Sequence, residues 1–398
     1  MLYRIPSPGT TFSEAAKSAA DHSRMVAQGW GITVGVAGWS LAGGHGPFGN
    51  ALGLGVDNIL AAEVVTADGE LIIASNRTHP DLWWALRGGG GSTWGVAVSF
   101  TLRAHPLPVG GITSASTTFA GDMCPPFADA DAGTGTGAVL NTTVDLVLAW
   151  QLSLSKNFSG LVFFSPTSSV AAMRAAECGA SWTVLVEIVF MGPPGNPELT
   201  GRLAALDAMA WVPGVNLTSK VVTPYKDQWA RASGYKLEPI FPVPWLGPSK
   251  NFLGGLPSVL VSRPAAADGR LAARLKASLA DCARPASDPM HTCDEMQLYQ
   301  DVTGNVGAPQ ASHVSISPSF RSAFIHLIFT NRAVDAAYAA AFYALGENSY
   351  MNEGAYEFEG DAWKQRLWGD NYPGLLAVKQ KYDPHGVFWC HHCIGDDE

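Results

Sequence analysis

The sequence predicts an α+β fold built from two main units. Two glycine-rich stretches, residues 34–58 and 86–95, flank one predicted β-hairpin in the first unit. Residues 109–140 are rich in Gly, Thr, Ala and Pro, a composition typical of a crossing between units. Strand and helix patterns mix beyond them, which predicts a sheet covered by helices on one side. At 398 residues, the chain is long enough for two cores.

The first element is a predicted helix over residues 10–28. Thr11 and Glu14 have the spacing of a capping box, in which each side chain satisfies a backbone N–H at the start of the helix. An alanine-rich body follows, and Gly29 is expected to end the helix.

The hairpin and its neighbours follow from turn residues and alternation. Residues 63–75 form two alternating runs joined by Asp68-Gly69, a strong hairpin signal. Pro80 is expected to begin a short helix that ends at Gly88. Residues 94–106 predict a further strand.

The second unit combines two kinds of element. Its strands are expected at residues 159–165, 183–191 and 323–329. Its helices are expected around residues 197–210, 264–281 and 333–345. The end of the chain is predicted to be helical and then to turn sharply at residues 383–386.

Charge and hydropathy exclude several classes of partner. The formal net charge is -9, and no basic run or stripe is present, so neither nucleic acid nor an anionic membrane surface is expected as a partner. No apolar run approaches the roughly 20 residues that a membrane-spanning helix needs.

Cysteines and glycosylation motifs favour a secretory history. Asn-x-Ser/Thr motifs are present, and the six cysteines form an even set whose 15 possible connectivities stay open. The first residues lack the apolar segment of a signal peptide. The motifs stand at Asn76, Asn141, Asn157 and Asn216.

The glycines of the first unit predict a ligand that approaches the main chain closely. GHGPFG, residues 44–49, fits the pattern G-x-G-x-x-G, but no strand is predicted before it, no helix is predicted after it, and Pro47 interrupts it. A dinucleotide fingerprint is therefore not expected. Two stretches almost without charge instead suggest N–H groups offered to a flat or phosphorylated ligand, although a turn-rich loop is the simpler alternative.

The same blocks resemble a known family. Residues 31–75 and 81–106, followed by YMNE at 350–353 and WGDNYPGLLAVKQKYDPHGVF at 368–388, resemble the berberine-bridge-enzyme-like oxidases of the vanillyl-alcohol-oxidase superfamily. The resemblance implies a PCMH-type FAD-binding domain, here its second half, at residues 1–108. It also implies an α+β substrate domain with an antiparallel sheet at 109–345, and a C-terminal segment at 346–398 that returns to the FAD domain.

The resemblance implies FAD as cofactor and a loop along the flavin from Thr33 to Gly46. Main-chain groups of this loop are expected near the flavin or its pyrophosphate. Other residues are expected at the adenine side and on the opposite side of the flavin. The expected cofactor-binding residues are Thr33, Val34, Gly35, Gly38, Gly43, Gly44, His45, Val96, Asn352, Asn371 and Tyr372.

Tyr350 is the candidate catalytic base. Oxidation of an alcohol or an activated C–H by flavin needs hydride transfer and a base for the hydroxyl proton. A phenol, with an ordinary pKa of ~10, serves only where nearby groups stabilise its anion. A tyrosine packed in the core is the alternative interpretation, and Glu353 and Glu357 are rival bases.

Val34 points to an oxidase. In the family that the chain resembles, a small valine at this step of the loop goes with access of O2 to the reduced flavin. The expected products are therefore an oxidised small-molecule substrate and hydrogen peroxide. The substrate itself stays open. The sheet of the middle unit would form the roof of its pocket, and the sequence alone does not tell which side chains of that sheet point inward.

The chain also departs from the family pattern. Gly31 stands where some members carry a flavin-linking cysteine. The family's first pyrophosphate loop and flavin-linking histidine precede the blocks that match, so a truncated sequence or a non-catalytic remnant is the alternative function. CHHC at residues 390–393 is expected to hold a disulfide or free thiols rather than zinc, and no metal site is expected.

Overall fold

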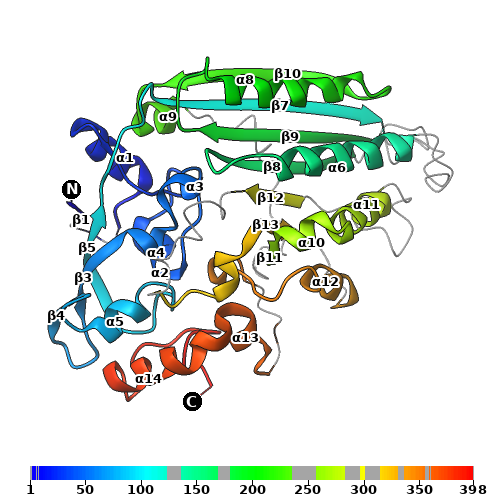
Figure 1. Cartoon of the computed structure of the whole chain (residues 1–398). Helices are drawn as coiled ribbons and strands as arrows, with labels where there is room; N and C mark the ends of the chain where they lie inside the picture. The colour runs from blue at the N-terminus through cyan, green and yellow to red at the C-terminus, as the bar shows by residue number, and fades with distance from the viewer. Residues whose placement is uncertain are drawn as a thin grey trace.

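The structure, a computed structural model, places the chain in two sheets with their helices and a small two-stranded ribbon (Figure 1). The residues that it describes are 2–5, 7, 9–122, 136–168, 180–234, 257–282, 296–300, 314–329, 336–354, 358 and 360–397.

The first sheet belongs to the N-terminal unit and is antiparallel, with the strand order β1-β5-β3-β4. Its strands are β1 (Leu2–Ile5), β3 (Ile59–Val65), β4 (Leu71–Ser75) and β5 (Val96–Arg103). The predicted hairpin is confirmed: β3 pairs with β4, and Gly69 adopts a φ of 81° in the turn between them. Helix α5 (Pro80–Ala85) begins at the proline, as predicted.

The second sheet has seven antiparallel strands in the order β10-β7-β9-β8-β12-β13-β11. It confirms the predicted α+β character of the middle unit. Its strands are β7 (Ile112–Asp122), β8 (Phe158–Ser168), β9 (Ala180–Phe190), β10 (Asn216–Tyr225), β11 (Ser258–Ser262), β12 (Met296–Gln300) and β13 (Ala323–Phe329).

Helices cover one face of this sheet, as Figure 1 shows for α6, α8, α10 and α11. Along β13, Ile325 and Leu327 belong to the core under the helices, while Ile328 belongs to a cluster with Tyr299. Successive side chains of a strand point to opposite faces, so His326 lies on the face opposite α6, α8, α10 and α11. The helices of this unit are α6 (Thr136–Leu152), α8 (Pro197–Asp207), α9 (Gln228–Gly234), α10 (Arg263–Ala267), α11 (Arg270–Cys282) and α12 (Ala336–Tyr343).

The C-terminal segment returns to the first unit, as the red helices of Figure 1 show. Helices α13 (Ala362–Trp368) and α14 (Tyr372–Tyr382) bury Trp363, Trp368 and Leu375 in the core that also contains Phe12 and Phe100. Buried Lys379 donates to Thr93 O at 2.9 Å and pairs with Asp383 at 2.5 Å. The two ends of the sequence therefore form one core.

Several predicted bounds were wrong. The capping box of α1 (Phe12–Asp21) is present, but the helix ends at Asp21 rather than near Gly29, and β2 (Arg24–Met25) follows and pairs with β6 (His105–Pro106). Ser23 adopts a φ of 53°, which breaks the helix. The helix predicted over residues 264–281 is two helices, separated at Gly269 with a φ of 89°.

The glycine-rich stretch contains helices that the sequence did not predict. They are α2 (Val36–Ala42), α3 (Gly49–Leu52) and α4 (Gly55–Asn58). Tertiary packing accounts for them, because Trp39 and Val36 of α2 are buried in the core of the first unit. Of the helices that the structure describes, none is long and apolar enough to cross a membrane.

Candidate active site

The residues from Thr33 to Gly38, called here the open strip, lie beside the N-terminus of α1; Thr33, Val34 and Gly38 are exposed, whereas Val36 and Ala37 face the core. Phe12 N donates to Val34 O at 3.1 Å, and Val36 N donates to Thr10 O at 2.9 Å, which fixes the strip against the helix. Val34 is an exposed apolar side chain, with 44% of its surface accessible. A Cβ added at Gly35 or Gly38 would meet no atom within 4 Å. The main chain is therefore approachable here.

The following residues, Gly43 to Gly46, are buried instead. Gly55 N donates to Gly44 O at 2.7 Å, and Val56 N donates to Gly43 O at 3.0 Å. The indole of Trp39 donates to His45 O at 2.8 Å. Residues 43–46, called here the glycine loop, thus form a packed connection that positions His45, which is 6% exposed.

Replacing Gly46 with alanine is expected to destabilise the protein by about 1–3 kcal/mol, the usual cost of overpacking. A Cβ at this position would lie 1.9 Å from the carbonyl oxygen of Gln28, so one of the two backbones must move. Urea unfolding of the variant measures the loss. Gly35→Ala is the matched control, since its Cβ would meet nothing; equal midpoints for the two variants would contradict the close approach.

Asn352 contacts the open strip and connects it to Tyr350. Asn352, on the 3-10 helix η8 (Met351–Glu353), donates from Nδ2 to the Tyr350 hydroxyl at 2.8 Å and to Gly38 O at 3.2 Å. Tyr350 is 2% exposed, and its ring packs edge-on against Phe320. The structure therefore brings together the predicted base, the predicted Asn352 and the loop.

A cluster of polar side chains continues inward from Tyr350. Glu353 Oε1 lies 3.4 Å from His45 Nε2, and Glu353 Oε2 lies 3.1 Å from His326 Nε2. The His45 ring meets the rings of Tyr299 and Tyr350 edge-on, with centroids 5.1 and 5.3 Å away. Burial, with a smaller contribution from His45, holds the pKa of His326 well below its usual range, so this imidazole is neutral.

The remaining predicted residues have other surroundings. Val96 is 52% exposed on β5, opposite Val65. Asn371 donates from Nδ2 to Ile316 O at 2.7 Å. Tyr372 packs against Trp363, and its hydroxyl accepts from Gly395 N at 3.3 Å. Their roles toward a cofactor stay predictions. The rival base Glu357 lies outside the described residues.

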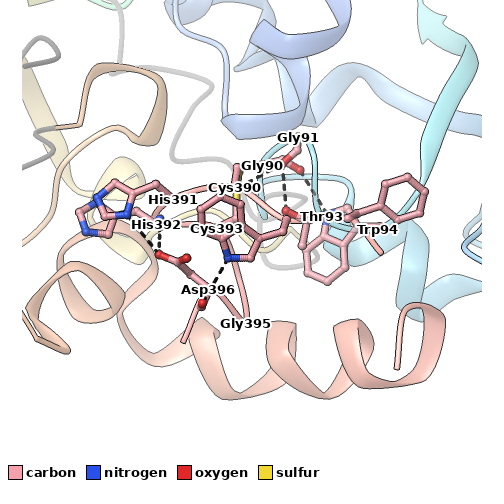
Figure 2. Close-up of a disulfide and its surroundings, with 12 residues drawn as sticks. Gly90, Gly91, Thr93, Trp94, Cys390, His391, His392, Cys393, Gly395 and Asp396 are labelled. Atoms are coloured by element: carbon pink, nitrogen blue, oxygen red, sulfur yellow. Dashed lines mark hydrogen bonds and ion pairs between the residues drawn. A yellow bond between two sulfur atoms is a disulfide. The ribbon is translucent and has the colours of Figure 1, made fainter. Parts of the chain in front are cut away.

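The C-terminal CHHC motif forms a disulfide between Cys390 and Cys393, one of the two states expected for it (Figure 2). The Cys393 sulfur lies 3.7 Å from Gly91 O in the second glycine stretch. The backbone N–H of His392 donates to Asp396 at 2.7 Å, and its ring contacts Phe358 O at 3.1 Å. Cys393 thus contacts the first unit, while the contacts of His392 lie within the C-terminal segment.

His326 and Tyr299 are the site residues that the sequence did not single out. Each lies on a strand of the seven-stranded sheet, and each faces the glycine loop rather than the helices. Alternation along a strand marks two faces but does not tell which one a partner unit covers. No local signal in the sequence separates His326 from an ordinary core histidine.

Two known families match the two ends of the chain. The FAD binding domain family matches residues 6–75, and the family "Berberine and berberine like" matches residues 349–395. The first match covers the open strip, and the second covers Tyr350, Asn352 and Glu353.

Relatives align with nearly the whole chain. The FAD-linked oxidoreductase ffsJ of Aspergillus flavipes is 27% identical over 408 residues, which cover 98% of this chain and 63% of that protein. The chain therefore spans less than two thirds of that relative's length.

Solved structures have the same fold. The VAO-type flavoprotein MtVAO713 from Myceliophthora thermophila C1 matches with a TM-score of 0.75 at 20% identity, covering 99% of this chain and 67% of that chain. A carbohydrate oxidase from Microdochium nivale matches with a TM-score of 0.68 at 16% identity, covering 100% and 78%. The chain thus matches the FAD binding domain family and the berberine-like family at its two ends and has the fold of VAO-type flavoproteins, which supports FAD as its cofactor.

Proposed function

We propose that the chain is the flavin-holding and substrate-binding part of an FAD-dependent oxidase. It would oxidise an alcohol or an activated C–H group of a small molecule and pass the electrons to O2, which gives hydrogen peroxide. The observation that carries the proposal is the position of Tyr350 and Asn352 directly beside the open strip from Thr33 to Gly38. Alignment of FAD-linked oxidoreductases with nearly the whole chain favours this function over a non-catalytic remnant.

The residues of the strip fit a flat, largely apolar ring system. Gly35 and Gly38 have no neighbour where a side chain would stand, so a planar ligand can approach their main chain closely. Val34 offers an apolar surface that the chain leaves exposed. Tyr350 and Asn352 bound the strip on the side of the second unit. We infer that these residues would hold the isoalloxazine ring, with Gly43, Gly44 and His45 shaping the loop from below.

Tyr350 would take the proton of the substrate hydroxyl. FAD, when bound, supplies the acceptor for the hydride that leaves the substrate carbon. The hydrogen bond from Asn352 Nδ2 stabilises negative charge on the phenolic oxygen, which favours its action as a base. Burial of the ring fixes the direction of the hydroxyl and keeps bulk water from it.

The seven-stranded sheet would supply the roof of the substrate pocket. On the face opposite α6, α8, α10 and α11, Tyr299 and His326 stand opposite His45 and Tyr350. We propose that residues 109–345 act as the substrate domain in this way, between the cofactor-binding residues 1–108 and the returning segment 346–398. Aromatic and imidazole groups at this face suit a hydroxylated substrate, which they can contact by stacking and hydrogen bonding.

Flavin reduction tests this function directly. The chain loaded with FAD is mixed without oxygen with carbohydrates, aromatic alcohols and aliphatic alcohols, and the visible flavin band is followed. We expect bleaching by one class of alcohol, and recovery of the band with release of hydrogen peroxide when air is admitted. A flavin that stays bound and is reduced by dithionite but by none of these alcohols would contradict the proposed reaction.

Replacing Val34 with phenylalanine is expected to slow reoxidation of the reduced flavin by O2. The larger side chain would stand at the exposed edge of the strip, where a small valine leaves access. Stopped-flow mixing of reduced protein with oxygenated buffer measures the rate constant. Val109→Phe is the control, because Val109 is 94% exposed and lies between β6 and β7; equal rates in both variants would remove Val34 from the path of O2.

We further propose that the protein passes through the secretory pathway. Asn76, Asn157 and Asn216 are exposed, as glycosylation acceptors must be. Protein expressed in a eukaryotic secretory host is expected to lose mass when treated with an N-glycosidase. An unchanged mass would contradict glycosylation at these motifs.

A further inference from the structure

Three side chains with metal-binding atoms meet between the two units. His45 comes from the glycine loop, His326 from β13 and Glu353 from η8. Their ligand atoms all lie within 4.8 Å of one another. His45 is more than 250 positions from the other two in the sequence, and His326 and Glu353 come from different elements, so the fold brings the three together.

The distances fit a small divalent ion. Around zinc, with ligands at about 2.0–2.1 Å, neighbouring ligand atoms of a tetrahedron are about 3.3 Å apart. Glu353 Oε1 lies 3.4 Å from His45 Nε2, and Oε2 lies 3.1 Å from His326 Nε2. Each carboxylate oxygen therefore lies about one tetrahedral edge from one imidazole nitrogen, Oε1 from His45 and Oε2 from His326.

The hydrogen bonding of His326 gives a second, independent indication. The residue is 0% exposed, and within the described part of the chain neither of its ring nitrogens has a hydrogen-bond partner. Glu353 Oε2 likewise has none among the described residues, although it lies close to His326. A buried polar group without a partner is costly, and a bound cation would satisfy the Nε2 atom of His326 and the carboxylate together.

We propose that His45, His326 and Glu353 form a binding site for one Zn²⁺ ion. Two imidazoles and one carboxylate are an established donor set for zinc, and three protein ligands leave the fourth position to water or to an oxygen of a bound small molecule. The rings of Tyr299 and Tyr350 flank the imidazoles and restrict their rotation. The expectation that the chain has no metal site is thereby replaced for this cluster.

Such an ion would clamp the two units together. Its ligands connect the glycine loop of the first unit, the seven-stranded sheet of the second and the returning C-terminal segment. Binding to the folded state alone raises the unfolding temperature in proportion to the logarithm of the ligand concentration. The site would therefore couple the stability of the interface to zinc without any requirement for flavin.

Equilibrium dialysis tests the site in untagged protein stripped of metal. Metal content is measured by mass spectrometry after dialysis against buffered Zn²⁺, beside flavin content from the visible spectrum. The variants are Glu353→Gln, which keeps the shape of the side chain, and His326→Leu, which fills its space. His385→Ala is the control, because His385 is exposed in the turn after α14.

We expect one zinc per chain in the wild type and in His385→Ala. Loss of an outer partner alone weakens metal binding by about 10–100-fold, so loss of a ligand should weaken it by more than about 100-fold in Glu353→Gln and His326→Leu. Zinc should raise the melting temperature of the wild type but of neither variant. Equal binding by wild type and both ligand variants, or no binding by wild type, overturns the proposal.

The visible spectrum of bound Co²⁺ reports the geometry of the metal site and does not depend on measuring the stability of a variant. In the wild type, Co²⁺ should give the visible d–d bands of a four-coordinate site, and Zn²⁺ should remove them. An octahedral, water-like spectrum would mean that Co²⁺ stays hydrated and does not enter a four-coordinate site, and this result would overturn the proposal. Flavin content is measured separately, so failure of this site is distinct from failure of the oxidase function.

Discussion

Replacing Tyr350 with phenylalanine is expected to lower kcat by about 10²- to 10⁴-fold, the usual contribution of a positioned base. The change removes only the hydroxyl, which receives the hydrogen bond from Asn352 at 2.8 Å. The ring would still fill its buried place against Phe320, so the fold and the open strip should remain. Anaerobic reduction of the flavin by substrate, followed in a stopped-flow instrument, measures the effect on the hydride step.

Two measurements separate a base from a packed tyrosine. Tyr3→Phe, in strand β1 of the first sheet, is the matched control and should reduce the flavin at the wild-type rate. Flavin content and melting temperature of Tyr350→Phe should stay close to those of the wild type. A fall in kcat of less than about tenfold, with flavin retained, would assign Tyr350 to packing, since a positioned base contributes more than that.

Replacing Glu187 with glutamine is expected to lower the free energy of unfolding by about 3–5 kcal/mol, because it removes one partner of a buried ion pair. Glu187 and Arg231 are 2% and 1% exposed, and Arg231 Nη2 lies 3.3 Å from Glu187 Oε1. Arg231 also donates to Ser114 Oγ at 3.0 Å and lies over the ring of Trp30 at 5.6 Å. The pair thus joins the loop-facing side of β9 to helix α9 and to the first unit.

Urea unfolding of a small set of variants measures this cost. The double variant Glu187→Leu with Arg231→Met should recover much of the loss, because it removes both charges rather than one. Lys17→Ala breaks an exposed ion pair with Asp21 on α1 and should change the midpoint little. Equal stability of Glu187→Gln and Lys17→Ala would contradict the expectation that breaking the buried pair costs more than breaking an exposed one.

Local signals in the sequence predicted the elements whose geometry depends on neighbouring residues. The capping box of Thr11 and Glu14 and the turn at Asp68-Gly69 both depend on residues within a few positions, and both are present. The end of α1 was not predictable in this way. Gln228 holds Val26 by two hydrogen bonds from α9, a partner 202 positions away, and this contact draws the chain out of the helix.

Only those residues of the candidate site that come from the N-terminal and C-terminal parts of the chain were predictable from the sequence. Tyr350 and Asn352 stand in a short recognisable block, and the structure places them against Gly38. His326 and Tyr299 come from strands whose register with each other and with the glycine loop is set by the whole sheet. The contacts of His326 and Tyr299 with His45 therefore depend on tertiary packing, which cannot be derived from a single sequence.

The visible absorption spectrum of the purified chain after incubation with FAD and gel filtration tests the central claim most directly. We expect flavin bands that co-elute with the protein at about one FAD per chain, the stoichiometry of one pocket per domain. Acid precipitation then distinguishes flavin that is released from flavin that is covalently held. Folded protein that elutes without colour, at FAD concentrations that saturate related flavoproteins, would contradict the assignment of the open strip as the cofactor site.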